Sequence, residues 1–107
     1  MRVLLFEDGG SREVALPGEW PEEELEELLG GEIETEPLAE GLDLVRLADG
    51  WLEALPCRYE LWRLDREAEL IPGDCAVVRA DQTGRWEDIL PQDGETAEEY
   101  IRRVAVR

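Results

Sequence analysis

The chain has no lysine, no histidine and no asparagine, and Ser11 is its only serine. Without histidine, acid–base catalysis near neutral pH would need a carboxylate or a thiol with a shifted pKa. Without lysine, neither a Schiff base nor the lysine of a phosphate-binding loop is available. Ser11 has no histidine that could activate it as a nucleophile. We therefore predict that the protein is not an enzyme, and we expect no catalytic residue and no cofactor.

Cysteine and long hydrophobic runs are also scarce. Cys57 and Cys75 are too far apart in sequence for a paired metal or redox motif, so we expect two small side chains in the core. The calcium-loop pattern is absent, and we predict no metal site. No apolar run approaches the roughly 18–20 residues of a membrane-spanning helix, and the apolar segment 3–6 is too short for a signal peptide. We expect a cytoplasmic protein that does not bind membranes.

Acidic residues are the main feature of the composition. The 107 residues include 28 Asp and Glu against 11 Arg, which gives a formal net charge of −17. Residues 13–45 hold twelve acids and no base, so most of the excess lies in one third of the chain. A surface built on salt bridges would interleave acidic and basic residues, whereas the charged residues of this segment are all acidic. The net charge also opposes direct binding to nucleic acid or to an anionic membrane.

The first third of the chain predicts a hairpin followed by a helix. Apolar residues in segments 3–6 and 12–16 flank a glycine-containing loop, which is typical of a hairpin. The continuous apolar run 3–6 suits a central strand that is covered on both faces. A helix is predicted to begin at Pro21 and to end at Gly30, with leucines spaced three and four residues apart on one side.

The middle of the chain predicts an edge strand and a second hairpin. Glutamate alternates with other residues over 32–36, which favours an edge strand that ends at Pro37 with its carboxylates in water. Asp49-Gly50 between two apolar runs predicts a tight turn within a hairpin over 42–55. That hairpin would place Trp51 in a strand and in the core.

The last third predicts a third hairpin and a second helix. Residues 74–89 fit two strands joined by a turn at 81–84. Residues 59–70 fit either a helix face or a strand, and the pattern does not separate the two. Thr96 with Glu99 three residues on is typical of a capping box at a helix start. Ala97, Tyr100, Ile101 and Val104 would then line one side of that helix.

Together these patterns predict one α+β domain over residues 1–107. We expect a mostly antiparallel sheet of about five to seven strands, arranged in three hairpins, with two short helices packed on it.

The acidic segment is the candidate binding surface. It could be a solvated face that only keeps the protein soluble, or a mimic of the nucleic-acid backbone that enters a basic groove on another protein. We expect the partner to be the basic surface of a host or defence protein. Trp20 and Trp62 are candidate aromatic contacts. The candidate carboxylates, which could form one continuous ridge, are Glu19, Glu22, Glu23, Glu24, Glu26, Glu27, Glu32, Glu34 and Glu36.

Two other functions fit the composition. A module that binds a nucleotide or other small molecule would need a concave pocket, lined by Trp51, Tyr59 or Trp62 together with Arg58 or Arg63. A plain structural adaptor would need no pocket at all.

A series of short motifs runs through about nine tenths of the chain in a characteristic order. They are Met1–Leu5, Leu29–Gly31, Ile33-Glu34, Leu42–Val45, Leu52–Pro56, Gly73–Val78 and Trp86–Ile89. This order resembles a small family known as domain of unknown function 3846, which occurs in phages, plasmids and integrated elements of gut Firmicutes. The chain differs from that family in a longer segment 59–70 and a heavier acid content.

The resemblance implies an α+β fold, an origin in a mobile element and no catalytic residues to transfer. Combined with the acidic surface, it leads us to expect an inhibitor of a host defence system, such as an anti-CRISPR or antirestriction protein.

Overall fold

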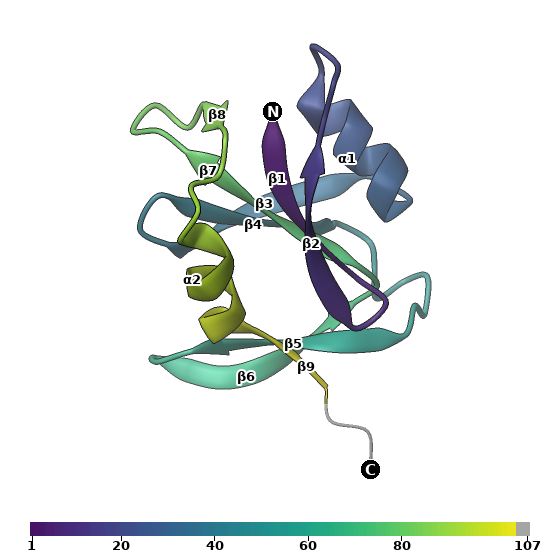
Figure 1. The fold of residues 1–107 in the computed structure, drawn as a ribbon. Helices are drawn as coiled ribbons and strands as arrows, with labels where there is room; N and C mark the ends of the chain where they lie inside the picture. Colours follow the sequence, from purple (N-terminus) through teal and green to yellow (C-terminus); the bar gives the residue numbers. More distant parts are fainter. Residues whose placement is uncertain (105–107) are drawn as a thin grey trace.

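The computed structural model describes residues 1–104 and places them in two antiparallel sheets with two short helices (Figure 1). The α+β class expected from the sequence is confirmed, with the strands divided between the two sheets. The helices are α1 (Pro21–Leu29) and α2 (Asp93–Tyr100). The large sheet has the strand order β2–β1–β7–β4–β3, with β8 paired to β7, and the small sheet has the order β6–β5–β9. The strands are β1 (Arg2–Glu7), β2 (Gly10–Ala15), β3 (Ile33–Ala39), β4 (Leu42–Leu47), β5 (Cys57–Arg63), β6 (Arg66–Pro72), β7 (Cys75–Ala80), β8 (Trp86–Glu87) and β9 (Ile101–Arg103).

The large sheet lies in the middle of the molecule and is covered on both faces (Figure 1). One apolar cluster packs between it and α1, and the other packs between it, the small sheet and α2. Because side chains alternate along a strand, β1 contributes to both. Val3 and Leu5 join Leu25 of α1 in one cluster, whereas Leu4 and Phe6 face the small sheet. The expectation of a central, doubly covered first strand is confirmed.

Helix α1 begins and ends where local chemistry predicts. Pro21 is its first residue. An N–H group at this position would have no acceptor within the helix, so its absence in proline costs no hydrogen bond. At the other end Gly30 has φ 93°, a left-handed conformation that glycine adopts without steric cost. The N–H groups of Gly30 and Gly31 both donate to the carbonyl oxygen of Glu26, at 2.9 and 3.0 Å. Three glutamates in the first turn interact favourably with the helix dipole.

The first and third predicted hairpins are present, and the second is wrong. β1 pairs with β2, and β7 pairs with β8 through the turn at 81–84. Residues 49–54 instead form a series of turns, in which the side chain of Trp51 is 65% exposed. The reason is that both edges of β4 are occupied, by β3 and by β7. A strand formed after Gly50 would therefore have no edge of β4 to pair with.

The predicted edge strand and the ambiguous segment are both strands. β3 lies at the edge of the large sheet and continues past Pro37 through a bulge between Pro37 and Ala39, so the predicted end at Pro37 is wrong. Proline is tolerated there because an edge strand has one free side. Residues 59–70, which fitted a helix or a strand, lie in the hairpin of β5 and β6.

The predicted capping box is wrong. α2 starts at Asp93, so Thr96 lies inside the helix, where its hydroxyl donates to the carbonyl oxygen of Gln92 at 3.3 Å. The helix also stops at Tyr100, because Ile101 and the two residues after it pair with β5. The end of the helix therefore depends on a partner distant in sequence.

Both cysteines are free thiols. Cys75 is buried in the core as expected, and burial raises the pKa of its thiol to about 12. Cys57 is only half-buried. Neither helix within residues 1–104 is long and apolar enough to cross a membrane.

Candidate functional site

The exposed side of α1 presents four glutamates on one face. Glu22, Glu23, Glu26 and Glu27 are spaced three and four residues apart, so they lie together on the helix surface. We call these four residues the acidic helix face. Glu22, Glu23 and Glu27 are exposed and Glu26 is half-buried, while Leu25 and Leu29 on the opposite side of the helix are buried against the large sheet. Within residues 1–104, none of the four carboxylates has an arginine within 4 Å.

Three further predicted residues lie beside this face. Glu19 is exposed and precedes the helix, and Glu24 is half-buried with its carboxylate turned toward Gly18. Trp20 is the residue that immediately precedes α1, and its side chain is 68% exposed. An aromatic side chain therefore stands in water at the start of the acidic helix face.

The structure does not extend the acidic helix face into β3. Glu34 lies opposite Arg46 in the strand pairing, and its carboxylate is 3.5 Å from the guanidinium of Arg46. Glu36 is 3.0 Å from Arg46 and 3.3 Å from Arg63. Glu69 of the small sheet is also 3.3 Å from Arg46. The prediction that the β3 carboxylates lie in water is right for Glu34, which is exposed, and wrong for Glu36, which is half-buried. Arginines from β4 and β5 pair with these carboxylates, so they do not form a free acidic surface.

The two groups of glutamates also lie on different sides of the large sheet. Ile33, which alternates with Glu34 along β3, packs with the cluster under α1, so the β3 carboxylates point toward the small sheet. Glu32 is exposed in the connection between α1 and β3. A single ridge from Glu22 to Glu36 is therefore not formed. The sequence contains one signal for this ion pairing, which is Arg46. It is the first basic residue after the acidic segment, and it lies opposite Glu34 in the hairpin of β3 and β4.

Trp62 lies in β5 of the small sheet, and Figure 1 shows the large sheet between the small sheet and α1. Its indole N–H donates to a carboxylate oxygen of Glu60 at 2.9 Å, and the guanidinium of Arg102 lies 4.7 Å from the ring centroid. Contacts of this kind hold an aromatic ring in place. Trp62 is 41% exposed, but the structure does not bring it to the acidic helix face.

Two of the exposed apolar residues lie where the sequence predicted a buried strand. Trp51 and Leu52 are 65% and 84% exposed in the connection between β4 and β5. That connection begins where the N–H of Ala48 donates to the carbonyl oxygen of Glu32 at 2.8 Å, just beyond α1. Their apolar character alone could not distinguish an exposed turn from a buried strand.

The residues expected to line a small-molecule pocket are divided between two cavities. Trp62 and Arg63 line one of about 300 Å³, and Tyr59 lines another of about 350 Å³. Trp51 and Arg58 line neither of these two.

Comparison of the chain with protein-family models, with curated proteins and with solved structures gives no match. The resemblance to domain of unknown function 3846 accordingly remains a prediction from the residues.

Proposed function

We propose that this protein acts without catalysis, by binding the basic surface of another protein through the acidic helix face. The supporting observation is the contrast between two groups of glutamates in one segment. The β3 glutamates have arginine partners, whereas those of the acidic helix face have none within residues 1–104. Exposed carboxylates at this density repel one another. A cationic partner would remove that repulsion on binding.

The density of charge on α1 is close to that of a nucleic acid. Residues 22–27 rise by about 7.5 Å along the helix axis, so four carboxylates give one charge per about 2 Å. Duplex DNA presents one charge per about 1.7 Å of its axis. A rigid helix with this spacing can occupy a groove lined by arginine and lysine, and the field of the whole protein would speed the encounter.

The partner we propose is a nucleic-acid-binding component of a host defence system, such as a CRISPR effector or a restriction enzyme. The net charge of −17 favours a cationic protein and disfavours direct contact with nucleic acid. Trp20 would add an apolar contact at one end of the face, as buried tryptophans do in protein interfaces. An origin in a phage or other mobile element, which the family resemblance implies, agrees with this role.

Reversing charge on the acidic helix face should abolish partner binding. In the variant Glu22→Arg/Glu23→Arg/Glu27→Arg we expect affinity for the partner to fall by at least about 100-fold, since like charges would then meet. The melting temperature should change little, because relief of the repulsion among these exposed carboxylates offsets the lost interaction of Glu22 and Glu23 with the helix dipole. The measurement is capture of basic proteins from a nucleic-acid-binding fraction of host extract, at low and at high salt, with and without competing duplex DNA.

A matched control separates the helix face from overall charge. Glu53→Arg/Glu67→Arg/Glu95→Arg makes the same change in net charge at exposed positions outside α1, and it should keep binding. Capture that resists salt and duplex DNA, or that survives the α1 reversal, would show that this face is not the binding surface.

A further inference from the structure

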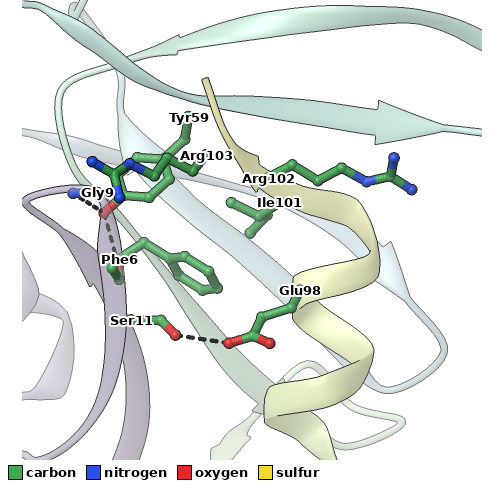
Figure 2. Close-up of a pocket in the computed structure, with 9 residues that line it drawn as sticks. Phe6, Gly9, Ser11, Tyr59, Glu98, Ile101, Arg102 and Arg103 are labelled. Carbon is green, nitrogen blue, oxygen red and sulfur yellow. Dashed lines mark hydrogen bonds between the residues drawn. The ribbon is translucent and has the colours of Figure 1, made fainter. Parts of the chain in front are cut away.

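A hollow of about 350 Å³ lies where the β1–β2 turn meets α2 and β9 (Figure 2). β2 is one edge of the large sheet and β9 is one edge of the small sheet. No strand pairing within residues 1–104 joins the two sheets at these edges, and the hollow opens between them. The acidic helix face does not contribute to it.

The floor of the hollow is apolar and held rigidly. Phe6 and Tyr59 meet edge to face, with ring centroids 5.7 Å apart, and Ile101 is buried beside them. The hydroxyl of Tyr59 accepts a hydrogen bond from the N–H of Gly9 at 3.0 Å and donates one to the carbonyl oxygen of Gly10 at 2.7 Å. Burial raises the pKa of Tyr59 to about 12, so the hydroxyl stays protonated and keeps the turn in place.

The rim carries opposite charges at its two ends. The guanidinium of Arg103 lies against Gly9, at a place where a side chain on that residue would collide with it. Within residues 1–104, Arg103 has no carboxylate within 4 Å. At the other end the hydroxyl of Ser11 donates to one carboxylate oxygen of Glu98 at 3.0 Å, which leaves the second oxygen available.

Figure 2 shows Arg103 and Glu98 on opposite sides of Phe6, with their polar ends well separated. Arg102 also lines the hollow, but its guanidinium extends away from it and lies over Trp62. A single guanidinium and a single carboxylate therefore remain to contact a bound molecule.

The volume of the hollow limits the size of the ligand. At about 350 Å³ it lies at the small end of the range of ligand pockets, roughly 300 to 1,000 Å³. The positive and the negative group on its rim match the two charged ends of a zwitterion. We infer that the hollow binds a short zwitterion of dipeptide size. Its carboxylate would contact Arg103, its ammonium Glu98, and its apolar side chains the floor of Phe6, Tyr59 and Ile101.

The charge of the protein favours a zwitterion over an anion. A net charge of −17 repels free anions from the surface, whereas a molecule without net charge is not excluded. Charge-assisted hydrogen bonds at both ends would fix its orientation.

The test is a nuclear magnetic resonance titration of the ¹⁵N-labelled protein with L-leucyl-L-leucine at millimolar concentrations. We expect shifts at the amides of Gly9, Gly10 and Ile101, and none at Gly30 or Gly84, which lie elsewhere. N-acetyl-leucyl-leucine lacks the ammonium and leucyl-leucinamide lacks the carboxylate. Each should bind at least about tenfold more weakly. Equal binding of either analogue, or the absence of shifts at the hollow, would overturn the inference.

Substitutions at two exposed residues test which charged end of the ligand Arg103 and Glu98 each bind. Arg103→Gln should weaken the dipeptide at least about tenfold while leaving the affinity for leucyl-leucinamide unchanged. Glu98→Gln should also weaken binding of the dipeptide at least about tenfold, while leaving the affinity for N-acetyl-leucyl-leucine unchanged. Arg85→Gln and Glu95→Gln are matched controls on exposed positions outside the hollow and should bind like the parent. A variant at Arg103 or Glu98 that binds the dipeptide like the parent would also overturn the inference.

Discussion

Replacing Asp93 by asparagine is expected to lower the free energy of unfolding by about 3 kcal/mol, because it leaves a half-buried guanidinium without its counter-charge. Asp93 is 1% exposed at the start of α2. One carboxylate oxygen accepts hydrogen bonds from Arg79 Nε at 2.9 Å and from the N–H of Leu90 at 2.6 Å. The other accepts a hydrogen bond from Arg79 Nη2, also at 2.6 Å. This contact joins α2 to β7, so its loss should weaken the whole domain.

The effect of Asp93→Asn should depend on pH. The hydrogen bonds from Arg79 hold the pKa of Asp93 below its ordinary value of 3.8. A carboxylate whose pKa is lower in the folded state contributes stability that is fully present above its unfolded pKa and is lost as pH falls through its folded pKa. Urea unfolding should therefore show a full difference between parent and variant at neutral pH, and a smaller one below about pH 4.

A double variant checks that the charge pair is responsible. Arg79→Met/Asp93→Leu replaces both partners with apolar side chains and should recover much of the stability lost in Asp93→Asn. A loss below about 0.5 kcal/mol in Asp93→Asn, within the range of ordinary surface substitutions, would contradict the structural role assigned to this pair.

Replacing Arg46 by methionine is expected to lower the free energy of unfolding by about 2 to 3 kcal/mol. The Arg46 side chain is 17% exposed, and it lies within 3.5 Å of carboxylates from both sheets, including Glu36 of β3 and Glu69 of β6. Methionine preserves most of the apolar stem but removes the charge. The carboxylates would then repel one another at the junction of the two sheets. Urea unfolding at neutral pH measures the effect.

The control for Arg46→Met is Arg66→Met. Arg66 pairs with Asp65 at 3.6 Å, but both side chains are largely exposed, so a change below about 0.5 kcal/mol is expected. Adding Glu36→Gln to Arg46→Met should restore part of the stability by removing one of the repelling charges. Equal losses in Arg46→Met and Arg66→Met would show that the cluster does not stabilise the contact between the sheets.

Features set by neighbouring residues could be predicted from the sequence. Pro21 and Gly30 mark the ends of α1 because each acts through its own backbone conformation. The acidic helix face follows from helix periodicity alone, since glutamates three and four residues apart share one side. The N-terminal hairpin and the turn at 81–84 likewise depend on local turn chemistry.

The predictions that failed depend on contacts between distant residues. Trp51 follows a good turn signal, but no strand forms there because both edges of β4 are already paired. The C-terminal segment becomes a strand at Ile101 because β5 offers it an edge, and that edge is not visible in the segment's own pattern.

The candidate site shows the same division. Sequence alone determined that residues 13–45 carry a large excess of acid and that part of it lies on one helix face. Only the tertiary structure decided which of those carboxylates would have partners. The net charge of a segment can be counted from the sequence without knowing where each side chain points. An ion pair, by contrast, needs two groups within a few ångströms of each other. Strand pairing and sheet packing bring Arg46 and Arg63 to β3, and within residues 1–104 they bring no arginine to α1.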